Sequence, residues 1–448
     1  MEAIALSDIA RVTGGELRGA DAGVTGVSID SRAVAPGDLF IAIRGPNHDG
    51  HRFVSQALAA GAAGAMVARD GDAGSAPGPL VAVDDTAAAL REWTRSHRVG
   101  FGIPAVAVTG TNGKTTTKEM IAAVLSQRYR VLKNEGNLNN QYGVPLSLLR
   151  LSREHEAMVM ELGMSGLGEI AGLCAMVMPL IGVVTNVGEG HTEFLKSLGN
   201  VARAKAELFA SLPARGTAIA NADDPWVVKG AAASPARVVQ FGIGPSADVR
   251  AEGIRFTAEG SAFTVGDTRF AVPMLGGHNV YNALAAIAVG DALSVPRGQS
   301  ARALAAMKPT PMRLEPVRLE KFFLINDAYN ANPASMRAAL ETLAGLELPG
   351  RKVAILGDML ELGEIEEKRH WEVGYLAGRR ADAVFTAGRL AAKIHQTADG
   401  AGAVAAHFNC VDELVHRLPL LLKFGDVVLV KASRGMQFER IVNAIISL

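Results

Sequence analysis

The stretch 104-PAVAVTGTNGKTTTKEMIAAVLSQR-128 decides the fold of this chain. Residues 104–110 form an apolar run of the kind that fills a strand buried on both faces. Residues 114–128 place apolar side chains at helical spacing, and a glycine-rich loop separates the two segments. A strand, a tight loop and a helix in this order predict a unit of a parallel sheet that is wound by helices.

The pattern of apolar runs and helical stretches divides the 448 residues into three regions. Residues 1–100 alternate short β-like runs, such as DLFIAI, with Ala-rich helical stretches, and residues 101–313 are strongly α/β. A segment with three prolines, KPTPMRLEPVRLEKF, predicts a hinge before residues 314–448, where a new strand series begins with FFLINDAYN and KVAILGDM. We therefore predict an α/β protein of three domains, with a P-loop-type parallel sheet in the centre and a Rossmann-like doubly wound C-terminal domain.

The composition excludes several classes of protein. Lys+Arg and Asp+Glu both number 45, so there is no basic excess that would indicate nucleic-acid binding. The two cysteines, Cys174 and Cys410, lie far apart and favour a reducing cytoplasm over a disulfide framework. The N-terminus lacks the cationic region of a signal peptide, and no apolar run reaches the about 20 residues that span a bilayer. We expect a cytoplasmic protein.

The loop differs from the phosphate-binding pattern G-x-x-x-x-G-K-[ST], because Val108 stands where the first glycine belongs. Backbone N–H groups at the start of the following helix would face an anion, Lys114 would bridge the β- and γ-phosphates, and Thr115 would bind Mg²⁺. The alternative is a glycine-rich turn with a capping threonine. No Asn-Lys-x-Asp stretch indicates a GTPase. The candidate nucleotide-binding residues of the loop are Gly110, Thr111, Asn112, Gly113, Lys114, Thr115 and Thr116.

Two further candidates follow neighbouring strands. Glu161 ends the run EAMVMELG, and His191 follows the run LIGVVTNVG. Both side chains would lie in the crevice where doubly wound sheets bind ligands, and a carboxylate is the better ligand for Mg²⁺. The alternatives are a solvent-facing strand end for Glu161 and a structural hydrogen-bonding role for His191.

A lysine lies on the apolar face of a predicted helix. In VARAKAELFASLP, Lys205 shares that face with Leu208 and Phe209. Such a lysine either extends its ammonium group to water or stays desolvated with a lowered pKa. In the second case its amine could react with CO₂, and the resulting carbamate could serve as a metal ligand.

Taken together, the motifs resemble the Mur ligase family, whose members make amide bonds in peptidoglycan precursors. The resemblance covers nearly the whole chain and rests on GTNGKTT, ELG, TNVGEGH, KAELF and GGHNVYNALAA. Later motifs, NDAYNANPASM, LGDMLELG and LVKASRGMQFERIV, are similar to those of members that add D-alanyl-D-alanine to UDP-N-acetylmuramoyl-tripeptide. The resemblance implies ATP, two Mg²⁺ ions, a carbamylated Lys205 and an acyl phosphate formed on the tripeptide carboxylate.

The resemblance also implies a role for each matching residue. Lys114, His191 and Lys205 would be catalytic, and Thr115, Glu161, His191 and Lys205 would bind metal. Residues 1–100 would bind the UDP-sugar, residues 101–313 ATP, and residues 314–448 a further ligand. Nucleotide contacts are implied for Asn279, Arg313, Asp327 (ribose) and Asn330 (adenosine), and substrate contacts for Ser31, Arg32, Asn139 and Asn140.

Two other functions remain open at this stage. Another Mur-type ligase or a folylpolyglutamate synthetase shares the ATP chemistry. The diaminopimelate- and lysine-adding relatives usually show an acceptor-site stretch D-N-P-R, which this sequence lacks. Folylpolyglutamate synthetase lacks the UDP-sugar-type N-terminal domain and the Tyr-Asn-Ala-Asn-Pro signature that this sequence resembles. A nucleotide-gated binding module would hydrolyse ATP slowly and form no bond. We expect a monomer, and the third residue of the tripeptide is left undetermined.

Overall fold

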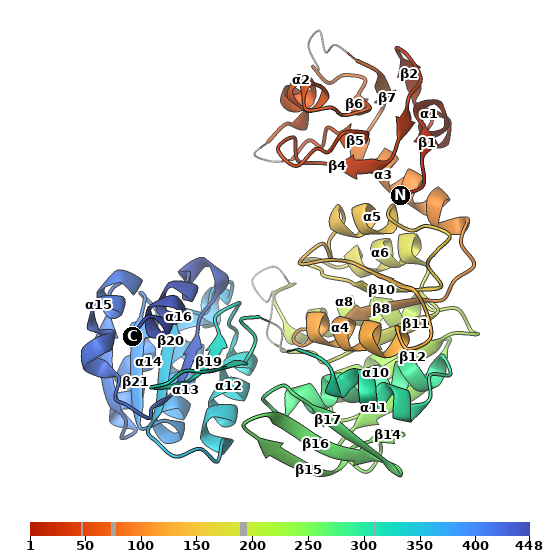
Figure 1. Ribbon diagram of the computed structural model, residues 1–448. Coiled ribbons are helices and arrows are strands. Elements are labelled where there is room, and N and C mark those ends of the chain that lie inside the picture. Colours follow the sequence, from red (N-terminus) through yellow and green to blue (C-terminus); the bar gives the residue numbers. More distant parts are fainter. Residues whose placement is uncertain (46–47, 73–77, 189–194, 309–310) are drawn as a thin grey trace.

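The computed structural model describes residues 1–45, 48–72, 78–188, 195–308 and 311–448. Its main sheets follow one another along the chain, at residues 16–83, 105–250 and 315–431. Figure 1 shows the first sheet stacked at one end of the central part, with the last sheet beside the central part in a separate lobe. This arrangement agrees with the predicted α/β class and the central parallel sheet.

The N-terminal sheet has five strands, all parallel except for the edge strand β2. In spatial order they are β2 (Glu16–Arg18), β7 (Leu80–Val83), β6 (Gly64–Ala68), β5 (Asp38–Ile41) and β4 (Gly26–Ser28). The flanking elements are β1 (Ile4–Ala5), α1 (Leu6–Thr13), β3 (Gly23–Val24), η1 (Gly50–Phe53), α2 (Val54–Ala59) and α3 (Thr86–Val99). Asp85 caps α3 by accepting bonds from Ala87 and Ala88 N–H, which fixes where this helix begins.

The central sheet has seven parallel strands. In spatial order they are β14 (Val249–Arg250), β13 (Arg237–Gly242), β12 (Thr217–Asn221), β11 (Ile181–Val184), β8 (Ala105–Thr109), β10 (Ala157–Glu161) and β9 (Val131–Lys133). Its helices are α4 (Lys114–Leu125), α5 (Gly143–Leu148), α6 (Glu169–Val177), α8 (Leu198–Ala210), α9 (Pro225–Ala231), α10 (His278–Ala292) and α11 (Arg297–Ala305).

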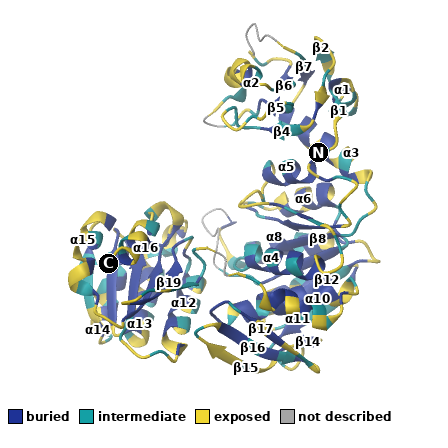
Figure 2. Ribbon diagram, in the orientation of Figure 1, coloured by how far each residue is buried: buried dark blue, intermediate teal, exposed yellow. Residues whose placement is uncertain are grey.

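The apolar run of β8 is buried on both faces of this sheet. Val106 and Val108 belong to the core that contains α4 and α10, whereas Ala105 and Ala107 belong to the core of α5, α6, α8 and α9. Figure 2 shows these strands as buried elements between the helical layers. Burial of one valine side chain contributes about 1.5–3 kcal/mol, so the run stabilises both layers.

Sequence reasoning missed an antiparallel sheet inside the central region. Strands β15 (Glu252–Thr257), β16 (Gly260–Val265) and β17 (Thr268–Val272) form a three-stranded antiparallel sheet. The signal was present, because alternation in SAFTV and TRFAV with Gly266-Asp267 between them is typical of a hairpin.

The C-terminal sheet has six strands, and only the edge strand β18 is antiparallel. In spatial order they are β18 (Glu315–Arg318), β19 (Phe323–Asp327), β23 (Val427–Lys431), β20 (Lys352–Gly357), β21 (Ala383–Ala387) and β22 (Val404–Phe408). One face packs on α12 (Pro333–Gly345), α13 (Glu366–Arg380) and α14 (Ala391–Gly400), and the other on α15 (Val411–Leu421) and α16 (Glu439–Ile446). The turns η2 (Gly363–Ile365) and η3 (Arg434–Met436) complete this part.

His370 of α13 is fully buried and fixes the loop after β20. Its Nε2 accepts a hydrogen bond from Met359 N–H at 2.9 Å, and its Nδ1 lies 2.7 Å from the Glu366 carbonyl. Because a backbone N–H can only donate, the proton of the neutral ring belongs on Nδ1. Burial lowers the pKa of His370, which favours this neutral form.

The predicted hinge has an unusual backbone. Met312 (φ 59°) and Leu314 (φ 46°) both adopt left-handed conformations, and Arg313 stands between them. Such values are uncommon for residues other than glycine. Among the described residues, no helix is long and apolar enough to cross a membrane.

Candidate active site

The phosphate-loop residues connect β8 to α4 at the carboxyl edge of the central sheet. The chain runs from β8 toward β9 and β10 on one side, whereas β11 lies on the other, so the loop occupies a topological switch point. Gly113 (φ 79°) precedes the first residue of α4, Lys114, so the free N–H groups of the helix start face outward from the loop. This is the geometry that binds phosphate groups.

The segment after β11 holds the loop in shape. The Asn186 side chain pairs with the backbone of Asn112, accepting from its N–H at 2.9 Å and donating to its carbonyl at 3.0 Å. The Thr185 hydroxyl donates to the same carbonyl at 2.6 Å. Thr111 Oγ1 and Gly188 N–H add a bond of 2.9 Å. Asn186 belongs to the run LIGVVTNVG, and the sequence alone predicted no role for it.

Lys114 is held within the loop. Its Nζ donates to the carbonyl oxygens of Gly110 at 2.9 Å and Thr111 at 3.1 Å. Burial lowers the pKa of Lys114, and Arg313 adds to this effect while Glu161 opposes it. A lysine so placed beside helix N–H groups forms a compact positive site for phosphate oxygens.

Glu161 ends β10 and is buried beside the loop. Asn134 binds its backbone in both directions, at 2.9 and 3.0 Å, and Asn139 Nδ2 donates to its Oε1 at 2.9 Å. Its second oxygen, Oε2, is buried without a hydrogen-bond partner among the described residues. A buried carboxylate oxygen of this kind fits a cation. Thr115 lines the same cavity, and oxygen donors of these two kinds suit Mg²⁺, which takes oxygen ligands and retains water.

Lys205 lies on α8 with its side chain buried, at 3% relative exposure, so its ammonium group does not extend to water. Burial, with a smaller contribution from Lys114, lowers the pKa of Lys205 well below its ordinary value. His191 lies outside the described residues. No group of three His, Cys, Asp or Glu side chains that could hold a metal occurs in the parts of the chain that the structure describes.

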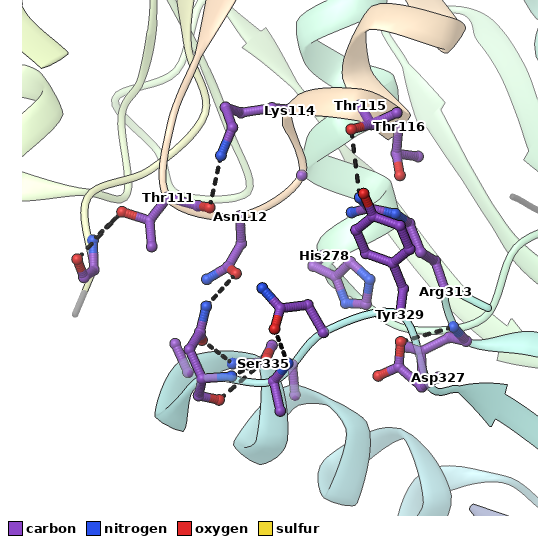
Figure 3. Close-up of a pocket in the computed structure, with 18 of the residues that line it drawn as sticks. Thr111, Asn112, Lys114, Thr115, Thr116, His278, Arg313, Asp327, Tyr329 and Ser335 are labelled. Atoms are coloured by element: carbon purple, nitrogen blue, oxygen red, sulfur yellow. Dashed lines mark hydrogen bonds between the residues drawn. The ribbon is translucent and has the colours of Figure 1, made fainter. Parts of the chain in front are cut away.

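The C-terminal part supplies the opposite wall of the site. Asp327, at the end of β19, forms an ion pair of 2.7 Å with the buried Lys431, whose Nζ also donates to the Asn330 carbonyl at 2.8 Å. Arg313 lies over the Tyr329 ring at 4.3 Å and contacts Thr115 Oγ1 at 3.4 Å (Figure 3). Sequence reasoning missed Lys431, although the motif LVKASRG places it at the end of a buried strand.

These walls enclose a cavity of about 550 Å³. His278, the first residue of α10, also lines it, and the protein around its ring lowers its pKa by displacing water, while Asp327 acts in the opposite sense. The sequence-predicted residues that line the cavity are Thr111, Asn112, Gly113, Lys114, Thr115, Thr116, Asn139, Glu161, Asn279, Arg313, Asp327 and Asn330.

Other predicted residues do not line this cavity. Gly110 is the first residue of the loop and packs closely against Thr185. Asn140 accepts bonds from Tyr142 and Gly143 N–H and thereby fixes the turn before α5. Ser31 and Arg32 lie after β4 in the N-terminal part, where Ser31 contacts Gln56 and Arg32 pairs with Asp30 at 2.8 Å.

Models of three domains match the chain. The "Mur ligase family, catalytic domain" matches residues 23–98, the "Mur ligase middle domain" residues 108–290, and the "Mur ligase, glutamate ligase domain" residues 312–434.

Full-length relatives give the same result. The UDP-N-acetylmuramoyl-tripeptide–D-alanyl-D-alanine ligase of Escherichia coli (strain K12) is 39% identical over 99% of both chains. The protein with the same name from Bacillus subtilis (strain 168) is 38% identical over 94% of this chain and 93% of its own. A MurF crystal structure from Acinetobacter baumannii superposes with a TM-score of 0.91 at 29% identity over all of both chains. MurF from Thermotoga maritima in complex with ADP gives 0.84 at 28% identity, covering 95% of this chain and 97% of that one.

Proposed function

This chain belongs to the Mur ligase family, and we propose that its site joins D-alanyl-D-alanine to the tripeptide carboxylate of UDP-N-acetylmuramoyl-tripeptide. It is an ATP-dependent ligase of peptidoglycan synthesis. The proposed substrate rests on the 39% identity, over 99% of both chains, to a ligase named for this reaction. The phosphate loop and its carboxylate neighbour Glu161 supply a site for the chemistry.

The reaction must turn a carboxylate into an acyl donor. A carboxylate alone would have to expel oxide, whereas transfer of the γ-phosphoryl group creates an acyl phosphate that expels phosphate. Lys114 and the N–H groups at the start of α4 would bind the phosphate oxygens and stabilise the charge that develops during transfer. The amine of D-alanyl-D-alanine then attacks the acyl carbon, and phosphate leaves. Water must be excluded, because it would hydrolyse the acyl phosphate.

Two magnesium sites are part of the proposal. Thr115 and Glu161 would hold one Mg²⁺, and the buried Glu161 Oε2 supports this assignment. His191 and a carbamylated Lys205 would hold the second. When bound, Mg²⁺ neutralises charge on the phosphate groups and on the reacting carboxylate.

The environment of Lys205 supports the carbamate. Only a neutral amine reacts with CO₂, and burial lowers the pKa of this lysine toward that form. The carbamate would return a negative charge to a site that already contains Lys114, whose positive charge would then stabilise it.

The remaining roles are proposals of the same kind. Residues 1–100 would bind the UDP part through Ser31 and Arg32, and residues 101–313 would bind ATP. Residues 314–448 would complete the nucleotide site through Asp327 and Asn330. Asn279 and Arg313 would contact the nucleotide, and Asn139 and Asn140 would face the acceptor-peptide region. We propose a monomer that works in the cytoplasm.

Acceptor-dependent phosphate release tests the function. We expect release from ATP only when UDP-N-acetylmuramoyl-tripeptide and D-alanyl-D-alanine are both present, with tripeptides ending in diaminopimelate and in lysine compared side by side. Glutamate-dependent release with a folate would assign the chain to the folylpolyglutamate reaction instead. Turnover that is indifferent to every acceptor would indicate a nucleotide-gated module.

A further inference from the structure

A hydrogen bond crosses the cavity from the C-terminal part to the phosphate loop. Asn332 Nδ2 donates to Asn112 Oδ1 at 2.8 Å, and Figure 3 draws this bond below the labelled Asn112. The two residues are 220 positions apart in sequence. Each lies in a quoted motif, GTNGKTT and NDAYNANPASM, but Asn332 has no role in the function proposed above.

The Asn332 end of this bond is fixed by the start of α12. Its Oδ1 accepts from Ser335 N–H at 2.9 Å, and Ser335 Oγ accepts from Asn332 N–H at 3.0 Å, which makes a complete capping box. Since Oδ1 is committed to the cap, Nδ2 is the part of the amide that points away from the helix. The cap therefore orients the Nδ2 donor of Asn332 toward the phosphate loop.

The Asn112 end is fixed equally well. The Asn186 side chain holds both the N–H and the carbonyl of Asn112, as described above. The backbone from which the Asn112 side chain projects therefore cannot turn without breaking two hydrogen bonds. Asn186, Asn112 and Asn332 form a continuous series of amide contacts from the end of β11 to the start of α12.

We propose that Asn332 is a positioning residue, which sets the C-terminal wall of the cavity against the phosphate loop by binding Asn112. The inference rests on the proposed function, because that function requires both walls to meet one substrate complex. The phosphate contacts come from the central part alone, whereas the attack of the acceptor amine needs the two walls in register. Loss of the bond should therefore lower turnover with the acceptor more than nucleotide affinity. Lys114 and the N–H groups of the loop stay in place, whereas the ribose and adenosine contacts proposed for Asp327 and Asn330 lie on the displaced wall.

The informative variant retains the N-cap of α12 but removes the contact with Asn112. Asn332→Ser retains an N-cap of comparable quality, but its side chain is too short to contact Asn112. Asn112→Ala removes the other partner. We expect each single variant to lower kcat/KM for D-alanyl-D-alanine about threefold to tenfold, as for one hydrogen bond. The double variant should have a kcat/KM no lower than that of the less active single variant, because both changes remove the same bond. Ser335→Ala, which damages the capping box from its other side, measures the share that comes from α12 stability.

Two further measurements separate this proposal from a merely structural role. The affinity of Asn332→Ser for a non-hydrolysable ATP analogue should fall by a smaller factor than kcat/KM for D-alanyl-D-alanine. In the protein alone, amide exchange of residues 109–116 should speed up in Asn332→Ser and stay at the wild-type rate in Ser335→Ala. Additive losses in the double variant, an equal loss of analogue affinity, or unchanged exchange would overturn the proposal. If the wild type shows no acceptor-dependent turnover, the proposed function fails, and the exchange measurement still decides whether Asn332 orders the loop.

Discussion

A methyl group at Gly110 should collide with Thr185, in the segment that follows β11. A Cβ built at this position lies 1.9 Å from Thr185 Oγ1 and 3.3 Å from the Asn186 nitrogen. Thr185 has little room to move, because it is 3% exposed and its hydroxyl is bonded to the Asn112 carbonyl at 2.6 Å. Gly110→Ala should therefore displace the segment that shapes the loop.

The expected magnitude follows from these contacts. Overpacking of a well-packed interior costs about 1–3 kcal/mol, and loss of the Thr185–Asn112 bond adds about 1 kcal/mol. We expect the unfolding free energy, measured in urea, to fall by roughly 2–4 kcal/mol. Affinity for a non-hydrolysable ATP analogue should fall at least about tenfold, which corresponds to about 1.4 kcal/mol, because the loop loses its shape.

Two variants separate the collision from backbone strain. Gly168 has φ 84° and no atom within 4 Å of a built Cβ, so Gly168→Ala measures strain alone. In Gly110→Ala/Thr185→Ala the nearest Thr185 atom that remains is Cβ at 3.1 Å, so the stability lost to overpacking should return, whereas the loss of the Thr185–Asn112 bond remains. Wild-type stability and affinity in Gly110→Ala, or a double variant equal to the sum of the single ones, would refute the reasoning.

Three other predictions concern single side chains. Lys205→Ala should lose activity and short-chain carboxylates should partly restore it; full activity without rescue would exclude the carbamate. Burial lowers the pKa of His370 from 6.5, so the unfolded chain binds this proton more readily and stability should fall as the pH drops below about 6.5. His370→Gln can keep the bond from Met359 N–H without a titrating ring and should flatten that dependence in urea unfolding; an unchanged slope would contradict this origin. Asn139→Ala should raise the Mg²⁺ concentration for half-maximal turnover by roughly tenfold, because the amide orients Glu161. Asn140→Ala removes the bonds that fix the turn before α5 and should leave the Mg²⁺ requirement unchanged, and equal Mg²⁺ requirements in the two variants would rule out that role for Asn139.

Patterns that follow from local physics were predictable from the sequence. Continuous apolar runs such as residues 104–109 must be buried on both faces, which predicted the wound parallel sheets. Gly113 and Lys114 predicted a glycine-rich loop between a buried strand and a helix despite Val108, and the structure has such a loop between β8 and α4; its binding of phosphate stays a prediction.

Contacts between distant segments were not predictable. Asn186 and Asn134 each bind a partner that is brought near only by strand order, and a side-chain amide carries no local sign of that partner. The neighbours Asn139 and Asn140 illustrate the same limit. They were grouped by sequence, yet one donates to Glu161 and the other fixes the turn before α5.

The left-handed residues on either side of Arg313 give the joint between the central and C-terminal parts a directional bias. Each such conformation costs about 1–2 kcal/mol for a residue with a side chain. A rotation that returns Met312 or Leu314 to the right-handed region would release that energy, whereas a rotation in the opposite sense would not. Glycine at both positions would remove this contribution of backbone strain, because glycine adopts left-handed conformations without that cost.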